Sequence, residues 1–334
     1  MNHEPPSFDL LVISGADSRK LMPMADCIRI VESAMKVVSR RGAQLPLRIS
    51  AKIPNRPLLC AAMPGYLEEP ASLGAKVIAV NPANAQRGLS SHLGVVVLFD
   101  AQSGIPLAII DAAAITGLRT AAASAVATNV LARADAVDLA ILGTGEQAAA
   151  HVRAMAEVRK LRSVRVWGRS FDKATAFATR EGVALGLPIT AHPSAQEAVA
   201  GAGIVCTTTS SREPILQGAW IERGTHVNLV GASSLDAREV DAELVMKSSY
   251  FVDFIPSALA QAGELQGVLP FGTDARAHIR GEIGQVLNGA VPGRTKSEEV
   301  TVYRSLGIAA QDLATAHGIY ERARHSGVGT KASL

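Results

Sequence analysis

A glycine-rich turn in the middle of the chain carries the clearest chemical signal. The apolar run 137–142 leads directly into GTGEQA at 143–148, and an alanine-rich helical stretch follows. This is the G-x-G-x-x-G/A form of a strand–turn–helix that binds the pyrophosphate of a dinucleotide. Gly143 permits the tight turn, Gly145 lets the backbone approach the phosphates, and Ala148 lets the helix pack closely. The N–H groups and the positive dipole end of that helix would face the phosphates. We assign to this predicted cofactor site Gly143, Gly145, Glu146 and Gln147.

The residues after the next predicted strand, 164–167, indicate which dinucleotide is bound. NAD-specific sites usually place an acidic residue there for the ribose 2′-hydroxyl. This chain has Gly168-Arg169-Ser170, and its first acid is Asp172. The guanidinium of Arg169 can pair with a 2′-phosphate, and Ser170 can donate a hydrogen bond to it. The pattern favours NADP(H), with NAD(H) as the alternative.

From about residue 129 to 311, strand and helix patterns alternate. We predict strands at 137–142, 164–167, 203–207, 226–230 and 250–254, with helices between them. This alternation is typical of a doubly wound parallel sheet, so the predicted fold class is α/β with a Rossmann-type domain at 129–311. Ligands of such sheets lie at the carboxyl ends of the strands. We therefore add to the cofactor contacts Thr207, Thr208 and Val230, and also Thr120, which we expect beside the glycine turn.

The preceding part of the chain has a different pattern. One amphipathic helix is expected from Pro23 to Gly42, then strands at 48–53, 58–63, 75–80, 95–99 and 105–110. A helical region at 111–131 follows. This predicts a smaller α+β domain with an antiparallel or mixed sheet. The segment 301–324 is predicted to be one long helix that packs back on it, so the domain comprises 1–128 with 312–334.

Composition restricts the function classes. The 334 residues suffice for about two domains, and 48% hydrophobic with 19% charged residues is an ordinary globular balance. A net charge of +3 without a basic run argues against nucleic acid or anionic membrane as a partner. Three scattered cysteines give neither a disulfide framework nor a zinc signature, so we expect no metal. The start, MNHEPPSFDL, has no signal-peptide pattern, and no apolar run is long enough to span a membrane, which favours a cytoplasmic protein. Glu282, Glu298 and Glu299 are interpreted as solvated charges.

Several ordered motifs together resemble the ornithine cyclodeaminase/μ-crystallin family. They are LGAK at 73–76, GLRTAA at 117–122, the central glycine turn, NLVGAS at 228–233 and YRSLG at 303–307. The resemblance covers nearly the whole chain. It implies a Rossmann domain and a substrate domain through which two subunits associate, and hence a homodimer.

The resemblance also implies a substrate site. Arg48 matches the family's carboxylate-binding arginine, Lys76 its lysine and Arg119 its second arginine. Guanidinium groups hold the carboxylate of an α-amino or α-imino acid well. Lys76, with its pKa lowered by nearby arginines, could act as acid or base or orient the substrate. Ser91 and His92 match a position near the nicotinamide, so we expect them to contact the cofactor.

One departure from the cyclodeaminases favours a different activity within the family. They carry an aspartate after the strand 226–230, where this chain has Ser233. A serine cannot supply a carboxylate's charge or basicity near neutral pH. The segment is closer to the ketimine reductase members, among them the Δ1-pyrroline-2-carboxylate reductases. We therefore predict NADPH-dependent reduction of cyclic or linear α-imino acids, such as Δ1-pyrroline-2-carboxylate or Δ1-piperideine-2-carboxylate.

Three alternatives remain open. The chain could be an ornithine or lysine cyclodeaminase with bound NAD. It could also be a small amino-acid dehydrogenase, such as an alanine dehydrogenase. The third is a non-catalytic protein that binds NADPH and a small carboxylate.

Overall fold

The computed structural model describes residues 9–269 and 274–333, and the chain divides into two compact units. The first unit comprises Met1–Arg119 and Ile308–Leu334, and the second comprises Thr120–Gly307. The first eight residues, which enter the signal-peptide prediction, lie outside the described part.

The first unit is built on a mixed sheet with the strand order β16-β1-β7-β6-β5-β4-β2, with β3 also pairing with β4. Strands β1 and β7 are parallel, and the other neighbours are antiparallel. The predicted α+β character of this part is therefore confirmed. Its strands are β1 (Asp9–Ile13), β2 (Ala43–Gln44), β3 (Ile49–Lys52), β4 (Leu59–Leu67), β5 (Ser72–Val80), β6 (His92–Phe99), β7 (Pro106–Asp111) and β16 (Thr330–Ser333). Its helices are α1 (Gly15–Leu21), α2 (Met24–Ser39), the 3-10 helix η1 (Pro82–Arg87), the start of α3 (Ala112–Leu131) and α12 (Ala309–Ser326).

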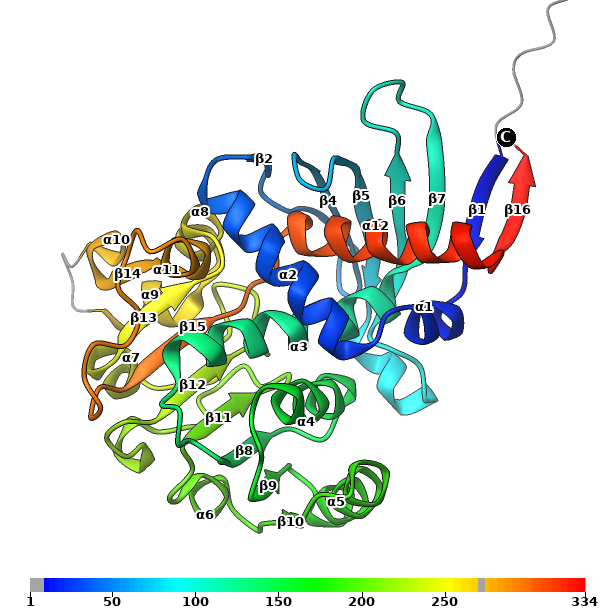
Figure 1. Ribbon diagram of the computed structural model, residues 1–334. Helices are drawn as coiled ribbons and strands as arrows, with labels where there is room; N and C mark the ends of the chain where they lie inside the picture. The colour runs from blue at the N-terminus through cyan, green and yellow to red at the C-terminus, as the bar shows by residue number, and fades with distance from the viewer. Residues whose placement is uncertain (1–8, 270–273, 334) are drawn as a thin grey trace, which may run out of the picture. The chain divides into compact units, whose positions relative to one another are not determined.

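Helix α12 covers one face of this sheet. It lies against β4, β5 and β6, and α2 packs on it (Figure 1). Close approach depends on glycine, because a Cβ at Gly65 would lie 2.9 Å from Ala309 Cβ and one at Gly74 would lie 2.9 Å from Leu313 Cδ2. On the opposite face of the sheet Ile49, Val77 and Leu93 are exposed, so residues 9–269 and 274–333 do not cover this apolar face.

The prediction of one long helix over 301–324 is wrong for its first residues. Residues Thr301–Arg304 form β15, a strand in the middle of the second unit's sheet, and α12 begins only at Ala309. The sequence TVY has the β-branched and aromatic residues that strands favour. Gly307, with φ +78°, then breaks the chain direction before the helix.

The second unit is built on an all-parallel sheet with the order β10-β9-β8-β11-β12-β15-β13-β14. From β8 the chain moves outward to β9 and β10, then returns to β11 on the other side of β8, which creates a topological switch point. The predicted Rossmann-type α/β fold is therefore confirmed. The strands are β8 (Asp138–Leu142), β9 (Ser163–Trp167), β10 (Ile189–Ala191), β11 (Ile204–Thr207), β12 (His226–Leu229), β13 (Ser249–Val252), β14 (Ile279–Glu282) and β15. The helices are the rest of α3, α4 (Glu146–Val158), α5 (Phe171–Leu185), α6 (Ala195–Val199), η2 (Gly218–Trp220), α7 (Ala242–Lys247), α8 (Ile255–Gln261), α9 (Gly263–Val268), α10 (Ala275–His278) and α11 (Ile283–Leu287).

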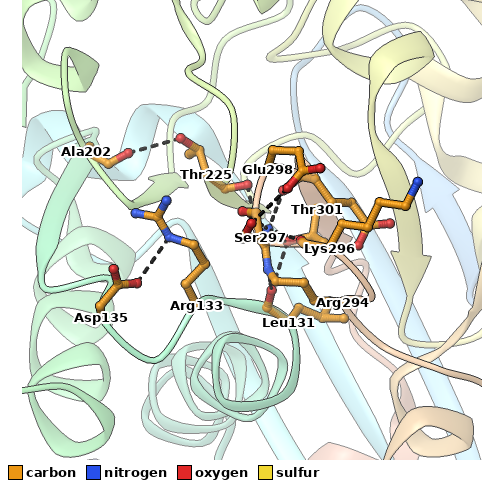
Figure 2. A network of polar contacts seen from close by, with 11 residues as sticks. Leu131, Arg133, Asp135, Ala202, Thr225, Arg294, Lys296, Ser297, Glu298 and Thr301 are labelled. Carbon is orange, nitrogen blue, oxygen red and sulfur yellow. Dashed lines mark hydrogen bonds and ion pairs between the residues drawn. The ribbon is translucent and has the colours of Figure 1, made fainter.

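The amino-terminal edge of this sheet is tied together by Arg294 (Figure 2). Its Nε donates to the carbonyl oxygen of Leu131 at 2.6 Å, and its Nη2 donates to Thr301 Oγ1 at 2.9 Å. Nearby, Thr225 Oγ1 donates to the carbonyl oxygen of Ala202 at 3.2 Å. The end of α3 is thus joined to the start of β15, so the edge opposite the glycine turn is held by side chains.

Glu282 is not the solvated charge that the sequence suggested. It is buried, caps α11 and accepts a hydrogen bond from the Ile255 N–H at 2.9 Å. Its carboxylate satisfies backbone donors at a helix start, which is a structural role. No helix in the described residues is long and apolar enough to cross a membrane, and these residues hold no group of three metal-ligating side chains.

Candidate functional site

The glycine turn forms at the carboxyl end of β8, in the second unit. Gly143 has φ +128°, and a Cβ there would lie 2.6 Å from Thr208 Oγ1, so only glycine fits. Gly145 caps α4 without a side-chain hydrogen bond, and a Cβ at that position would meet no atom within 4 Å. The thirteen-residue helix α4 therefore begins at an open, exposed turn that carries Glu146 and Gln147. This open helix start fits a dinucleotide pyrophosphate.

The end of β9 places Arg169 and Ser170 next to this turn along the sheet edge. Arg169 is exposed, while Ser170 caps α5 by accepting a hydrogen bond from the Lys173 N–H at 3.3 Å. A Cβ at Gly168 would lie 2.8 Å from Thr144 Cγ2, which shows how closely the two loops approach. The hydroxyl of Ser170 keeps its proton for another acceptor, such as a phosphate oxygen.

The other predicted cofactor contacts differ in how much of each side chain is available. Thr208 Oγ1 flanks Gly143 and donates to the Leu142 carbonyl at 3.1 Å. Thr207 is buried and its hydroxyl donates to Glu239 at 2.6 Å, so its side chain makes a contact inside the protein. Val230 is buried at the end of β12. The buried Thr120 Oγ1 has no hydrogen-bond partner in the described part of the chain.

In the first unit, Lys76 and Arg119 meet at a buried carboxylate that we did not predict, Asp312 of α12. Lys76 Nζ lies 2.9 Å from Asp312 Oδ1 and 2.8 Å from Oδ2. Arg119 Nε donates to Oδ1 at 2.9 Å, and its Nη1 lies 3.3 Å from Gln311 Oε1. The side chains of Lys76 and Asp312 are 2% and 0% exposed, respectively. Strand β5 and helices α3 and α12 thus bring together two cations and one anion out of water.

Arg48 and His92 lie on the same face of the sheet as Lys76. Ile49 pairs with Ala62 and Lys76 pairs with Met63, so the register places Arg48 opposite Met63, in the same row as Lys76. His92 begins β6 and pairs with Val80, four residues along β5 from Lys76. Ser91 Oγ lies 2.9 Å from His92 Nδ1. The charges of Arg48 and Arg119 act on both Lys76 and His92, which places all four side chains close together.

Burial controls the charges of this cluster. Desolvation lowers the pKa of Lys76 to about 7, although Asp312 opposes the shift, and Arg119 and Arg48 add to it. Desolvation and the same cations lower the pKa of His92 to about 4, which leaves its imidazole neutral. Burial raises the pKa of Asp312, but Lys76 and Arg119 outweigh it and lower that pKa overall. Asp312 pairs with Lys76 and Arg119, and Arg48 adds a further positive charge to the cluster, which leaves a positive potential for an anionic ligand.

A model of one protein family matches this chain over residues 11–327. Its description is "Ornithine cyclodeaminase/mu-crystallin family". This chain belongs to that family. The resemblance inferred from the sequence motifs is therefore confirmed.

Relatives within the ornithine cyclodeaminase/mu-crystallin family include imine reductases. A Δ1-pyrroline-2-carboxylate reductase from Bacillus thuringiensis is 35% identical over 323 residues, which cover 96% of this chain and 99% of that protein. The solved Thermococcus litoralis Δ1-pyrroline-2-carboxylate reductase, in complex with NADH and L-proline, is 36% identical with a TM-score of 0.94, covering 97% of this chain and 100% of that one. A solved archaeal alanine dehydrogenase dimer with bound NAD is 30% identical with a TM-score of 0.91, covering 97% and 99%.

Ser233, at the position where the resemblance implies an aspartate in the cyclodeaminases, is exposed. The nearest acid along the chain, Asp236, is exposed and forms an ion pair with Arg212. Its carboxylate is thus engaged elsewhere on the surface.

Sequence reasoning missed Asp312. It sits in a helix stretch whose neighbours Ala310, Gln311 and Leu313 are all fully buried. An acid inside such a buried run is the signal that could have found it, because an acidic residue is almost never fully buried without a partner.

Proposed function

We propose that this chain reduces the C=N bond of α-imino acids, cyclic or linear, with NADPH as the favoured hydride donor. Δ1-Pyrroline-2-carboxylate and Δ1-piperideine-2-carboxylate are the candidate substrates. The observation that carries the proposal is the buried cluster of Lys76 and Arg119 around Asp312, with Arg48 beside it. The two relatives reported as Δ1-pyrroline-2-carboxylate reductases support the reductase over the other activities of the family.

The two arginines would hold the substrate carboxylate. Arg119 uses Nε for Asp312 and Nη1 for Gln311, and among the described residues its Nη2 has no partner, which leaves the N–H groups of Nη2 for a ligand. A guanidinium N–H donates a strong, charge-assisted hydrogen bond to a carboxylate oxygen. Binding the carboxylate fixes the imine carbon, and such fixed geometry is what hydride transfer requires.

Lys76 would deliver the proton that accompanies the hydride. Reduction adds a hydride to C2 and a proton to the imine nitrogen, so the reaction consumes one proton. Lys76 has its pKa lowered to about 7 by burial, close to the value that suits a general acid at neutral pH. Asp312 holds Nζ through both of its oxygens, which stabilises the protonated form and fixes its direction.

The dinucleotide would be held by the second unit. When bound, its nicotinamide ring supplies the hydride. The glycine turn with Glu146 and Gln147 would receive the pyrophosphate, and Arg169 with Ser170 would bind the 2′-phosphate that distinguishes NADPH. Ser91, His92, Thr120, Thr207, Thr208 and Val230 remain the predicted further contacts. The Thermococcus relative is described with NADH, so NADH is the competing donor.

A homodimer is the second part of the proposal. The sheet face opposite α12 exposes Ile49 at 65%, and Val77, Leu93 and Leu73 lie on the same uncovered surface. A contiguous apolar face of this kind usually marks an interface. A second copy of the chain would cover it, as the described dimer of the archaeal alanine dehydrogenase suggests. Three unpaired cysteines, of which Cys60 is exposed, fit the reducing cytoplasm.

The direct test is a substrate panel. The purified chain is offered Δ1-pyrroline-2-carboxylate, Δ1-piperideine-2-carboxylate and pyruvate with ammonia, each with NADPH and with NADH. We expect consumption of reduced cofactor with the two cyclic imines, faster with NADPH. Preference for pyruvate with ammonia would favour alanine dehydrogenase. Ammonia release from ornithine without net cofactor change would favour the cyclodeaminase. Binding of NADPH without turnover of any substrate would favour a non-catalytic protein.

A further inference from the structure

The loop that follows β12 is held by two buried side chains of opposite charge. Glu239 accepts a hydrogen bond from the Gly231 N–H at 2.7 Å. Arg304, on β15, donates from Nη1 to the Leu229 carbonyl at 3.1 Å and from Nη2 to the Ala232 carbonyl. Glu239 therefore binds an N–H group of the backbone from Leu229 to Ala232, and Arg304 binds two of its carbonyl oxygens.

Glu239 also holds the loop that follows β11. Its Oε1 accepts from the N–H of Thr209 at 2.8 Å and from the Thr209 hydroxyl at 2.6 Å. Its Oε2 accepts from the Thr207 hydroxyl at 2.6 Å, in addition to the Gly231 N–H. One carboxylate thus receives four hydrogen bonds from two neighbouring loops, which uses most of its acceptor capacity.

Both charged groups are out of water and compensated. Glu239 is 3% exposed and Arg304 is 1% exposed. Arg304 Nε lies 2.6 Å from Glu264 Oε1, which also accepts from the Tyr250 hydroxyl at 2.6 Å. Burying charges costs several kcal/mol unless their hydrogen bonds are made. Because burying these charges costs free energy, we expect such a network where the shape of the two loops is important for function.

Gly231 shows how tightly the two loops are joined. A Cβ at this position would lie 2.0 Å from the Thr209 carbonyl oxygen and 2.5 Å from Glu239 Oε1. The two loops therefore contact each other backbone to backbone, with Glu239 beneath them. The backbone of Glu239 is fixed as well, because the Glu239 carbonyl oxygen accepts hydrogen bonds from the N–H groups of Ile215 and Leu216.

We propose that Glu239 and Arg304 are positioning residues, which hold the loops 207–209 and 229–233 in the shape that receives the nicotinamide half of the dinucleotide. The inference rests on the proposed function. The glycine turn after β8 and the loop after β9 serve the phosphates and the adenosine end, at the switch point of the sheet. The ends of β11 and β12 are next along the same edge, so the other half of an extended dinucleotide falls on them.

The test separates the two halves of the ligand. Dissociation constants are measured by calorimetry for NADPH and for adenosine 2′,5′-bisphosphate, which lacks the nicotinamide. In Glu239→Gln, the amide NH₂ would face an N–H or hydroxyl donor, so at least one loop contact is lost. We expect the Kd for NADPH to rise about 10- to 100-fold, the range for losing a charged hydrogen bond. The Kd for the bisphosphate should change less than about twofold.

Two further variants keep the test decisive if Glu239→Gln folds poorly. Thr209→Val removes the hydroxyl that donates to Glu239 and accepts from the Ser211 N–H, and it keeps the backbone hydrogen bond from Thr209 to Glu239. We expect the same split at about threefold. Arg304→Lys keeps the positive charge near Glu264 but cannot reach both carbonyls, and should show the split too. The matched control is Glu181→Gln, since Glu181 is a buried carboxylate of the same unit that pairs with Arg153 and Arg180.

Each outcome of these binding measurements either supports or overturns the inference. Selective loss of NADPH affinity in the three variants but not in the control supports the inference. Equal losses for both ligands would make Glu239 a general stabiliser of the unit, and unchanged constants in Thr209→Val and Glu239→Gln would remove its role, so either overturns it. Binding is read without turnover, so a wild-type chain that binds NADPH but reduces no imino acid refutes the proposed reaction and leaves this inference standing.

Discussion

Replacing Asp312 by asparagine should displace the pH dependence of imine reduction. The substitution keeps the size and the hydrogen-bond acceptor of the side chain and removes its charge. Lys76 Nζ lies 2.8 Å from Asp312 Oδ2, and both groups are buried. With an effective dielectric constant of about 20, two unit charges at that separation interact by about 6 kcal/mol. At about 1.36 kcal/mol per pH unit, this is an upper bound of about 4 units on the pKa of Lys76.

The sign of the effect follows from the lysine. Its pKa is lowered to about 7 in the wild type, mainly by burial, so the protonated form is lost as the pH rises through that value. Reduction consumes this proton, and kcat/KM should fall above pH 7. In Asp312→Asn the pKa of Lys76 drops further, because the attraction of the Asp312 carboxylate, which opposes the effect of burial, is lost. Even a shift of about 2 units would leave about one hundredth of Lys76 protonated at pH 7, and reduction there should drop about 50-fold.

The assay is kcat/KM for Δ1-pyrroline-2-carboxylate with NADPH, from about pH 5 to about pH 9. Ionisation of the imine itself belongs to the substrate and does not move between proteins, so only the displaced part of the profile reports Lys76. Asp253→Asn is the control, since Asp253 is a buried carboxylate that binds the Leu306 and Gly307 N–H groups. It should keep the wild-type profile. A wild-type profile and rate in Asp312→Asn, at unchanged Tm, would refute the assignment of Lys76 and Asp312.

Three further substitutions test other parts of the account. Arg169→Ala should raise the KM for NADPH by about 10-fold or more and leave the KM for NADH within about twofold, because only NADPH carries the 2′-phosphate; equal changes for both cofactors would contradict the 2′-phosphate site. Arg119→Lys keeps a charge beside Asp312 but loses the planar fork, so kcat/KM for the imino acid should fall by about 100-fold, mostly through KM; retention of wild-type kinetics would place the carboxylate elsewhere. Val77→Glu puts a charge on the uncovered sheet face and should convert a dimer to a monomer in analytical ultracentrifugation; an unchanged dimer would place the interface on another surface.

Local patterns were enough to predict the elements that carry the cofactor half. The strand–glycine–helix turn depends on residues within a few positions of Gly143, and the five predicted strands of the second unit are all present. The sequence analysis did not predict strand β15, because the strand has only four residues and a helical pattern follows it closely. Its place between β12 and β13 is set by pairing with strands about 50 to 75 residues earlier in the chain.

The substrate-binding cluster in the first unit was predictable only in part, because it too depends on contacts between residues far apart in the sequence. Lys76 and Arg119 were found by resemblance, but their shared partner Asp312 is 236 and 193 residues away from them in sequence. Glu239 and Arg304 act on backbone groups of loops whose contact is purely tertiary. A buried charge has no local pattern of its own, because its energy depends on which partners the fold brings within hydrogen-bond distance.

The central claim is that a hydride passes from the nicotinamide to C2 of an imino acid held by this chain. The most direct measurement is transfer of label from NADPH deuterated at nicotinamide C4, prepared in each of its two stereochemical forms, to Δ1-pyrroline-2-carboxylate. Mass spectrometry of the product should show proline with one deuterium, located at Cα, from one of the two forms. Absence of proline, or proline without deuterium from both forms, would contradict the account.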